Sequence, residues 1–462
     1  MAKRSFPAQP RSATPSSPKP QPQPALTVKN PRAAGIDVHD GVHWVAVPPE
    51  SDPEPVRPFG AFTGDLEALA DWLADRRVDT VAMESTGVYW IPLFELLERR
   101  GFRVFLVDAR AVAKVDGRPK TDIHDCQWIQ RLHSYGLLEK AFRPEDDIVV
   151  LRGYVRQRQN LIAYASQHIQ HMQKAMVEMN LKLTLVVSDI VGKTGMTIIK
   201  AILAGQRDPI ELAKLRDGRC KHTEQEIAKA LVGNWREEHL LALKQAVELH
   251  EFYHCKIREC DQAIDTYLSR LPNRAGDKPL ESGPAKHRNK ANDPMFDARK
   301  RLYEMLGVDL TTIDGISVGV ALTIASEIGH DVSAFRNEKA FSNWLGLAPN
   351  HKITGGKIKS RKTRPGANRI ATGLRMAAAS LLRTPTALGA FGRRMRSHVG
   401  SPKAITAIAH KLAKMVYRML KHGEDYVKHG AEEYELQYQE RRLAALRRNA
   451  AALGFRLEPQ IS

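Results

Sequence analysis

Four acidic residues in the N-terminal third have side chains and positions that suit metal-dependent phosphodiester chemistry. Asp37 lies in an otherwise apolar segment with strand-like alternation, and Glu84 ends a second short apolar segment. Asp122 and Asp125 are three positions apart in a segment with helical spacing, so their side chains share one helix face. Mg²⁺ prefers carboxylate oxygens, and bound ions can hold a scissile phosphate with its leaving oxygen. We therefore predict that these four carboxylates form an Mg²⁺ site.

Each of these acids also has an ordinary structural explanation when it is taken alone. A strand aspartate is often a turn or capping residue, and Asp122 and Asp125 could be solvated helix charges. Asp108 and Asp116 are rival candidates, but capping at a strand exit and in a loop explains them more simply. The combination of the four acids in one order of elements is what favours a metal site.

The elements around the acids predict an α/β domain with a mixed sheet. We expect strands at residues 34–47 (two strands joined by a tight turn), 59–62, 80–84 and 102–107, and helices at 65–77, 90–100 and 121–135. Asp65 is expected to cap the start of the first helix, and Gly101 to close the second. Strand ends and the start of the last helix can then converge on one point.

The positive charge of the chain is concentrated in one segment. The net charge is +18, yet residues 350–423 hold 17 Lys and Arg and no Asp or Glu, while the remaining residues carry 53 basic and 52 acidic side chains. The segment also contains regularly spaced apolar residues, so we expect it to fold rather than form a basic tail. Such a segment favours a polyanionic partner, and a solvated surface is the alternative.

The basic residues that we predict to contact nucleic acid lie around three glycines and in one arginine cluster. They are Lys352, Lys357, Lys359, Arg361, Lys362, Arg364, Arg369, Arg393, Arg394 and Arg396. Glycine lets a backbone approach phosphate closely, and the cations add affinity through counterion release. Because few aromatic residues are interleaved, we expect contact with the nucleic-acid backbone rather than base stacking.

Composition and periodicity divide the chain into six segments. They are a disordered Pro-rich arm (1–32), the α/β domain (33–144), a helical coiled-coil-like spacer interrupted near Gly192 and 205–208 (145–271), a linker (272–294), a basic and mainly α-helical domain (295–423) and a helical tail (424–462). Within the basic domain, residues 310–329 resemble a helix-hairpin-helix unit, whose turn amides approach phosphate. An ordinary αα-corner is the alternative.

Several classes of protein are excluded by composition. No apolar run approaches the length of a membrane span, the N-terminus has no hydrophobic signal region, and the four cysteines form no disulfide or zinc framework. We therefore expect a protein of the cytoplasm, without a membrane partner.

The motifs that carry these residues resemble those of the DEDD transposases of bacterial insertion sequences of family one-ten. Within that family, the resemblance is greatest to subgroup eleven-eleven. The motifs are GID at Asp37, MESTGVYW at Glu84, KTDIHDCQWIQRL at Asp122 and Asp125, and in the second half IDGISVGVALTIASEIG, FSNWLGLAPNHKITGGK and RPGANRIATGLRMAAASLL. The resemblance covers residues 33–423, although the helical middle matches only in character.

This resemblance implies a fold, an activity and partners. It implies an RNase H-like (RuvC-like) N-terminal domain that binds Mg²⁺ through the four carboxylates, and a C-terminal transposase domain whose serine joins covalently to DNA. It also implies a structured guide (bridge) RNA that pairs with donor and target DNA, assembly into a homo-oligomer (a dimer or a tetramer), and a place at the bacterial nucleoid.

The sequence departs from the family at the nucleophile. The family serine precedes a glycine after an LGLxP segment, and here that position is Thr354. Threonine has the same hydroxyl but is β-branched and stiffer. Ser360 is the fallback nucleophile, and the third possibility is that there is no covalent nucleophile, with both hydroxyls bonded to a phosphate or a loop amide.

Three functions therefore fit the sequence. The first is an RNA-guided DNA recombinase. The alternatives are a metal-dependent endonuclease of Holliday-junction type, which would use water instead of a side-chain hydroxyl, and an inactive descendant that only binds nucleic acid.

Overall fold

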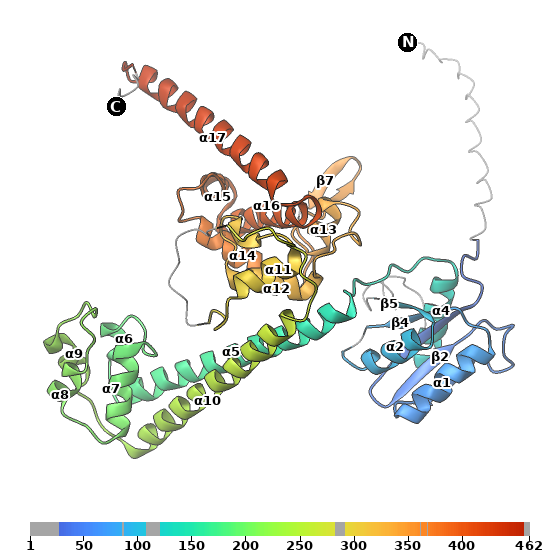
Figure 1. Cartoon of the computed structure of the whole chain (residues 1–462), viewed down its shortest axis with the longest axis horizontal. Coiled ribbons are helices and arrows are strands. Elements are labelled where there is room, and N and C mark those ends of the chain that lie inside the picture. Colours follow the sequence, from blue (N-terminus) through green and yellow to red (C-terminus); the bar gives the residue numbers. More distant parts are fainter. Residues whose placement is uncertain are drawn as a thin grey trace, which may run out of the picture. The chain divides into compact units, whose positions relative to one another are not determined.

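The computed structural model describes residues 27–456, except residues 86, 108–120, 282–291, 361 and 367, and except the side chains of Lys352 and of many residues of the last helix. The chain divides into two compact units, one that runs to Phe142 and one that starts at Arg143 (Figure 1). Among the described residues, no helix is both long and apolar enough to cross a membrane.

The first unit contains a five-stranded sheet with the strand order β3-β2-β1-β4-β5. Its strands are β1 (Ala33–Val38), β2 (Val42–Ala46), β3 (Val56–Gly60), β4 (Thr80–Glu84) and β5 (Arg103–Val107). The β1–β2 and β2–β3 pairs are antiparallel, whereas β4 lies parallel to both β1 and β5. The predicted mixed sheet is therefore confirmed, and with its flanking helices it fits an RNase H-like fold.

The two faces of this sheet carry different helices, because side chains alternate along each strand. Helices α1 (Thr63–Asp75) and α2 (Trp90–Arg99) share a core with Ile36 and Met83. Helix α4 (Asp122–Ser134) covers the other face, where its Ile129 packs with Ala82 and Val107. Both faces of β1 and β4 are therefore buried, as the apolar character of these strands requires.

Three boundaries of the first unit differ from the sequence prediction. Strand β3 ends at Gly60 instead of starting near residue 59, because its pairing with β2 runs from Val56 to Gly60. Helix α1 begins at Thr63, and Asp65 is not its N-cap. Instead, the Asp65 carboxylate reaches back from inside the helix and accepts a hydrogen bond from the Phe62 amide at 3.3 Å.

The third difference concerns the predicted disordered arm. Residues 1–26 of the arm lie outside the described residues, but its last part is attached to the first unit. The backbone amides of Lys29 and Asn30 donate to the Ser134 carbonyl at 2.8 and 2.9 Å, and the Asn30 side chain donates to the His133 carbonyl at 2.8 Å. These bonds satisfy carbonyls at the end of α4 that have no partner within the helix.

The second unit begins with two long helices that lie side by side, α5 (Asp146–Glu178) and α10 (Glu237–Leu268) (Figure 1). A buried ion pair joins them, with Arg158 Nε 2.6 Å from Asp261 Oδ1. The chain between them forms a small helical body with its own apolar core, so the predicted interruptions near Gly192 and 205–208 are folded structure. Its helices are α6 (Leu183–Val186), α7 (Lys193–Leu203), α8 (Pro209–Lys214) and α9 (Glu224–Ala230).

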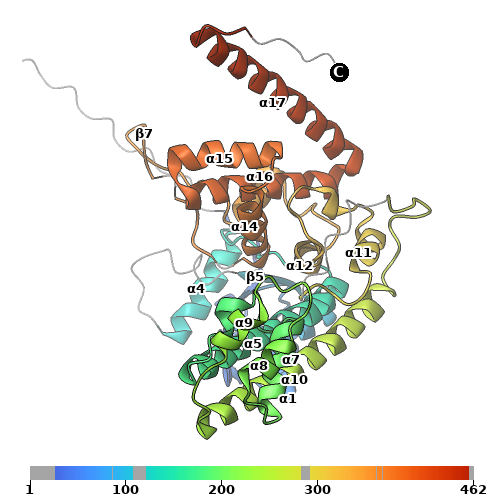
Figure 2. The same ribbon diagram turned by 90° about the vertical axis from the view of Figure 1, so that its left-hand side faces the viewer.

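The rest of the second unit is mainly helical and contains one β-hairpin. Its elements are α11 (Ala298–Leu306), the 3₁₀ helix η1 (Leu310–Thr312), α12 (Val318–Ile328), α13 (Glu338–Trp344), the hairpin strands β6 (Lys352–Thr354) and β7 (Lys357–Ser360), α14 (Arg369–Leu381), α15 (Ala387–Val399), α16 (Ser401–His422) and α17 (Glu424–Ala452). Figures 1 and 2 show α17 extending from the end of α16 away from the other C-terminal helices.

The region predicted to resemble a helix-hairpin-helix unit has only one 3₁₀ turn before its glycine-bearing turn. Gly315 has a φ of 87°, a conformation that favours glycine. A Cβ at this position would lie 2.9 Å from the Leu381 side chain, so the turn packs against the end of α14. Helix α12 then packs on α5, where Arg156 binds both carboxylate oxygens of the buried Glu327 at 2.8 Å.

Candidate active site

The carboxylates of Asp37 and Glu84 lie at the same edge and on the same face of the sheet. Strands β1 and β4 are parallel and in register at Ile36 and Met83, so Asp37 and Glu84 are the next residues along each strand. Ile36 and Met83 point to the face of the sheet that α1 and α2 cover. Because neighbouring side chains of a strand point to opposite faces, Asp37 and Glu84 lie on the face covered by α4. Asp37 is only 6% exposed.

A glycine brings the two helical carboxylates to this edge. A Cβ at Gly35 would lie 2.2 Å from the Gln130 nitrogen and 2.4 Å from the Cys126 carbonyl oxygen, so the α4 backbone lies directly on β1. The Gln130 side chain adds a hydrogen bond of 3.2 Å to the Ala33 carbonyl. Because α4 is fixed so closely, its first turn, which carries Asp122 and Asp125, lies beside the end of β1.

The electrostatic surroundings of Asp37 indicate that other carboxylates lie near it. The pKa of Asp37 is raised above its usual range, mainly because burial disfavours its charged form. His39 opposes this shift, while the negative charges of Glu84 and Asp125 add to it. The predicted convergence of strand-borne and helix-borne acids is therefore found in the first unit.

His39 is part of the cluster, although the sequence analysis did not identify it. Its Nε2 atom lies 3.1 Å from Asp37 Oδ2 and 3.7 Å from Asp122 Oδ1. One ligand atom from each of these three residues lies within 4.8 Å of the others. The sequence signal was the spacing of two between Asp37 and His39, which puts both side chains on one face of an extended segment.

This set of side chains suits a divalent metal ion. Negative charges that are close together and partly buried repel one another unless a proton or a cation lies between them. Carboxylate oxygens suit hard cations such as Mg²⁺, whereas an imidazole is a more usual ligand of transition metals. The metal-binding role of the four carboxylates stays a prediction, and His39 is placed to orient Asp37 through its 3.1 Å contact.

The candidate nucleophile Thr354 lies in the second unit, at the end of β6. It forms a cross-strand pair with Lys357, and Gly355 and Gly356 make the turn between them with φ values of 55° and 72°. Two positive φ values in succession are typical of the two-residue turn that matches the twist of a hairpin. Thr354 is exposed, and its hydroxyl has no hydrogen bond to any other residue that the structure describes.

Ser360, the fallback nucleophile, has a structural partner. Its hydroxyl oxygen accepts a hydrogen bond from the Lys362 backbone amide at 3.3 Å, and its side chain is partly buried. A loop amide is therefore a sufficient explanation for this hydroxyl. The choice of Thr354 over Ser360 remains a prediction.

The predicted nucleic-acid-binding residues fall into two groups. Exposed cations on the hairpin, just after it and on α15 are Lys357, Lys359, Lys362, Arg364, Arg394 and Arg396. Arg369 and Arg393 also stabilise the fold: Arg369 donates to Gln159 Oε1 at 2.7 Å, and Arg393 donates to the carbonyls of Leu382 and Thr384.

The remaining candidates cannot be placed. Arg361, the side chain of Lys352, and the rival acids Asp108 and Asp116 lie outside the described residues.

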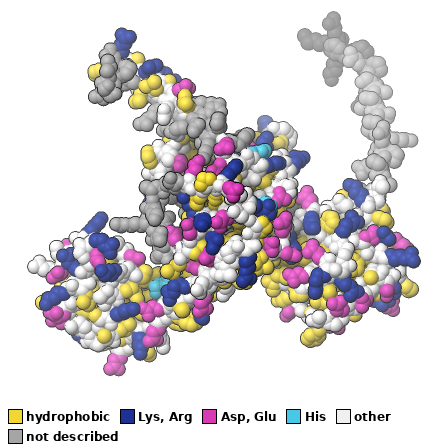
Figure 3. Space-filling model, in the orientation of Figure 1, with side chains coloured by type: hydrophobic (Ala, Val, Ile, Leu, Met, Phe, Trp, Pro, Cys, Tyr) yellow, Lys and Arg dark blue, Asp and Glu magenta, His cyan; other side chains and the backbone are white. Residues whose placement is uncertain are grey.

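On the face drawn in Figure 3, Lys and Arg side chains are interspersed with Asp and Glu.

Two family models match the chain, one over most of the first unit and the start of the second, and the other within the second unit. Residues 34–181, which include all four carboxylates, match the DEDD transposase model of IS110 elements, described as Transposase. Residues 308–392, which include Thr354 and Ser360, match the model described as Transposase IS116/IS110/IS902 family. Together with the sheet and its acidic cluster, these matches define a transposase, an enzyme that cleaves and recombines DNA.

The chain belongs to the IS110 family of transposases. The matched regions together span about half of its length. No curated protein matches the chain. The assignment to subgroup eleven-eleven stays a prediction, because neither model distinguishes subgroups.

Proposed function

We propose that this transposase is an RNA-guided recombinase that cleaves and exchanges DNA strands with Mg²⁺-binding carboxylates and the Thr354 hydroxyl. The single observation that carries the proposal is the convergence of Asp37, Glu84, Asp122 and Asp125 at one edge of an RNase H-like sheet. Such a site suits phosphodiester chemistry, because it can bind cations that in turn bind phosphate.

Each group has a separate role in the proposed reaction. Bound Mg²⁺ would polarise the scissile phosphate and stabilise the charge on its leaving oxygen. Asp37, Glu84, Asp122 and Asp125 would hold the ions, and His39 would keep the Asp37 carboxylate in one orientation through its 3.1 Å contact.

The Thr354 hydroxyl would attack the phosphorus atom of the scissile bond. A bond forms between the Thr354 oxygen and phosphorus, and the bond from phosphorus to the 3′ oxygen breaks. The hydroxyl loses one proton and the leaving oxygen gains one, so the exchange of esters needs no further reactant. The product is a covalent protein–DNA ester with a free 3′-hydroxyl that can take part in strand exchange.

Guidance by RNA, the choice of DNA and the oligomer are parts of the same proposal. The exposed cations on and just after the hairpin suit the backbones of nucleic acids and carry no sequence information by themselves. Sequence choice is then best supplied by a structured guide RNA that pairs with donor and target DNA. We propose that these nucleic acids are bound by a homo-oligomer, either a dimer or a tetramer.

The decisive experiment detects the covalent ester. The full chain is combined with Mg²⁺, RNA transcribed from the DNA that flanks its gene, and duplexes of the element ends, and is then denatured. We expect a protein–DNA adduct that Thr354→Ala abolishes and that Ser360→Ala leaves in place. Thr354→Ser is the matched control, because it keeps the hydroxyl and removes the stiffer β-branch, so it should form adduct at least as fast as the wild type.

Other results would favour the alternatives. Cleavage that continues in Thr354→Ala without any adduct would indicate a nuclease that uses water. Adduct formation that is unaffected by Asp37→Ala would contradict the metal site. No Mg²⁺-dependent cleavage with any flanking RNA would favour a descendant that only binds nucleic acid.

A further inference from the structure

The hairpin that carries Thr354 has two chemically different faces. Its register pairs Ile353 with Ile358 and Thr354 with Lys357. Because side chains alternate along a strand, the two isoleucines share one face, while Thr354 and Lys357 share the opposite face. Among the described residues, Lys359 has no cross-strand partner, because the register shifts between Lys352 and Ile353. One face is therefore apolar, and the other carries the candidate nucleophile with the Lys357 cation.

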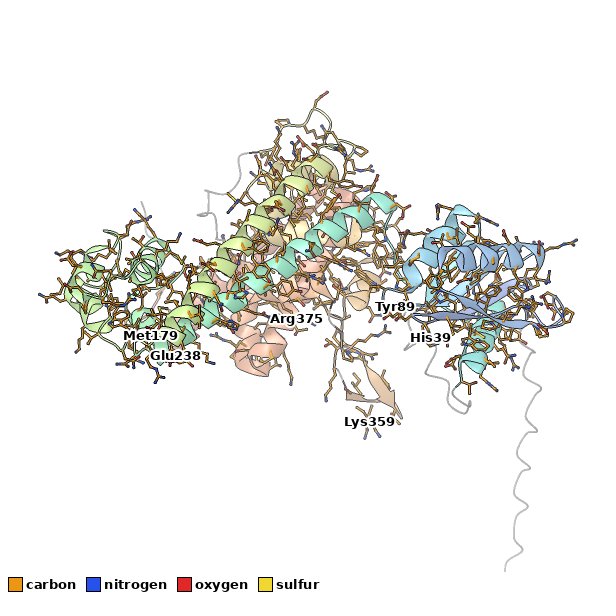
Figure 4. The ribbon with its side chains drawn as sticks, turned by 90° about the horizontal axis from the view of Figure 1, so that it is seen from below. His39, Tyr89, Met179, Glu238, Lys359 and Arg375 are labelled. Carbon is orange, nitrogen blue, oxygen red and sulfur yellow. The ribbon has the colours of Figure 1, made fainter. Side chains whose placement is uncertain are left out.

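The isoleucine pair does not belong to any core of the described part of the chain. Ile353 is 61% exposed and Ile358 is 42% exposed. Figure 4 labels Lys359 on this hairpin and shows the two strands extending away from the helices of their own unit. The pair occupies most of one face of a ladder only three to four residues long, so its exposure is a property of the whole face.

The charge around this apolar face indicates what it contacts. Lys357 and Lys359 lie on the same hairpin, the exposed Lys362 and Arg364 follow it in the chain, and no acid occurs between Asn350 and Gly423. A second copy of the same hairpin would bring like charges together, which opposes self-association. A nucleic acid provides both complements, because its phosphates attract the cations and its bases are apolar on their faces.

We propose that Ile353 and Ile358 pack against unstacked bases at an opened step of a DNA duplex, while the Thr354 face contacts the sugar-phosphate backbone beside that step. Aliphatic side chains are known to wedge between base steps and unstack them. The inference rests on the proposed function, since it assigns a substrate contact to the hairpin that bears the nucleophile. It extends the sequence prediction, in which the lack of aromatic residues left only backbone contacts.

The wedge predicts a preference that can be measured without cleavage. In Mg²⁺-free buffer, the full chain is titrated with a mixed-sequence DNA duplex and with the same duplex carrying a central mismatch. Opening a paired step costs free energy that the mismatch removes, so the wild type should bind the mismatched duplex at least tenfold more tightly, a difference of about 1.4 kcal/mol or more. A fluorescent adenine analogue beside the mismatch should show unstacking on binding.

Two pairs of substitutions separate the faces. The first pair is Ile353→Ser/Ile358→Ser. The ratio of its affinity for the mismatched duplex to its affinity for the paired duplex should fall to about one, and the fluorescence change should disappear, while the salt dependence of binding stays the same. In Lys357→Gln/Lys359→Gln both affinities should fall and the salt slope should decrease by about two, with the ratio unchanged. Ile353→Val/Ile358→Val is the matched control, since it keeps an apolar face and should keep the ratio. Equal melting temperatures would show that the variants fold.

The outcomes also distinguish this inference from the proposed function. An unchanged affinity ratio in the serine variant overturns the wedge, and a change of its oligomeric state by sedimentation, with the ratio intact, would instead make the pair an interface between copies. A wedge effect in a chain that forms no Thr354 adduct would refute the nucleophile and leave the wedge standing. Binding to neither duplex by the wild type would overturn both.

Discussion

The carboxylate cluster and the basic hairpin are built in opposite ways. Asp37 is almost fully buried, and its neighbours are fixed by two parallel strands and by a helix in backbone contact with Gly35. Thr354 is exposed at the end of a short ladder with two glycines beside it. Groups that hold metal ions must be fixed before the ions arrive, because like charges do not gather by themselves. A side chain that meets a large, variable partner can instead be presented on a small projection.

The strongest way to break this comparison is to remove a buried carboxylate. Asp37→Asn keeps the volume and the hydrogen-bonding capacity but removes the charge that would bind a metal ion. We expect Mg²⁺-dependent strand cleavage to fall by about a thousandfold, the upper part of the range for one electrostatic contact to a transition state. Single-turnover cleavage measures the loss, and retained activity would show that the cluster is not the catalytic centre.

The contact between α4 and β1 can be tested at Gly35. Gly35→Ala places a Cβ where backbone atoms of Gln130 and Cys126 already lie, so α4 must shift. We expect a loss of about 3 kcal/mol in the stability of the first unit, measured by hydrogen exchange of the α4 amides. Gly41→Ala is the matched control because nothing lies within 4 Å of its Cβ position, and it should be nearly neutral.

The packing of α4 on the neighbouring strand β4 should depend on pH through His133. Its ring is buried on α4 and lies 2.9 Å from the Thr80 hydroxyl, and burial lowers its pKa to about 4. A lowered pKa means that the unfolded chain binds the proton first, so stability is complete above the ordinary histidine pKa and is lost as the pH falls toward 4.

We expect α4 to lose about 2 kcal/mol of stability between about pH 7.5 and about pH 5. Hydrogen exchange of the α4 amides at each pH measures this loss. Since other groups titrate as well, the His133→Gln variant provides the reference, and a pH dependence equal to that of the wild type would exclude His133 as the cause.

The smallest effect is expected in the hairpin. Gly356→Ala puts a Cβ on a residue with a φ of 72°, which costs about 1 kcal/mol locally. Nothing lies within 4 Å of that Cβ position, so the melting temperature of the whole chain should not change. Adduct formation should slow severalfold because the ladder beside Thr354 is weakened. A large loss of global stability would mean that the hairpin is part of a core after all.

The sequence predicted the first unit well because its signals were local. Short apolar strands, one helix with a paired set of acids and a tight turn are enough to place Asp37, Glu84, Asp122 and Asp125 at one edge of a sheet. The predicted cap at Asp65 and the predicted bounds of β3 were wrong because the exact ends of elements depend on contacts with other residues. The bounds of β3 depend on its pairing with β2, and the Asp65 side chain reaches back to the Phe62 amide from inside the helix.

The rest of the site could not be predicted because it depends on contacts across the fold. The contact of His39 with Asp37 follows from their local spacing, but its distance of 3.7 Å from Asp122 depends on the close packing of α4 on β1 at Gly35. Arg369 donates to Gln159 of the distant helix α5, and Arg393 donates to carbonyls of the segment between α14 and α15. A count of basic residues therefore overestimates those that are free to contact nucleic acid.

The close approach at Gly35 also restricts how this transposase can change under selection. When a larger residue collides with a side chain, a smaller neighbour can restore the fit, and laboratory evolution often finds such second-site revertants. At residue 35 the nearest obstacles are a main-chain nitrogen, a main-chain carbonyl oxygen and an α-carbon, which no substitution elsewhere removes. Libraries that vary the sheet and α4 should therefore recover glycine here in every active clone, even where the surrounding apolar residues are exchanged freely.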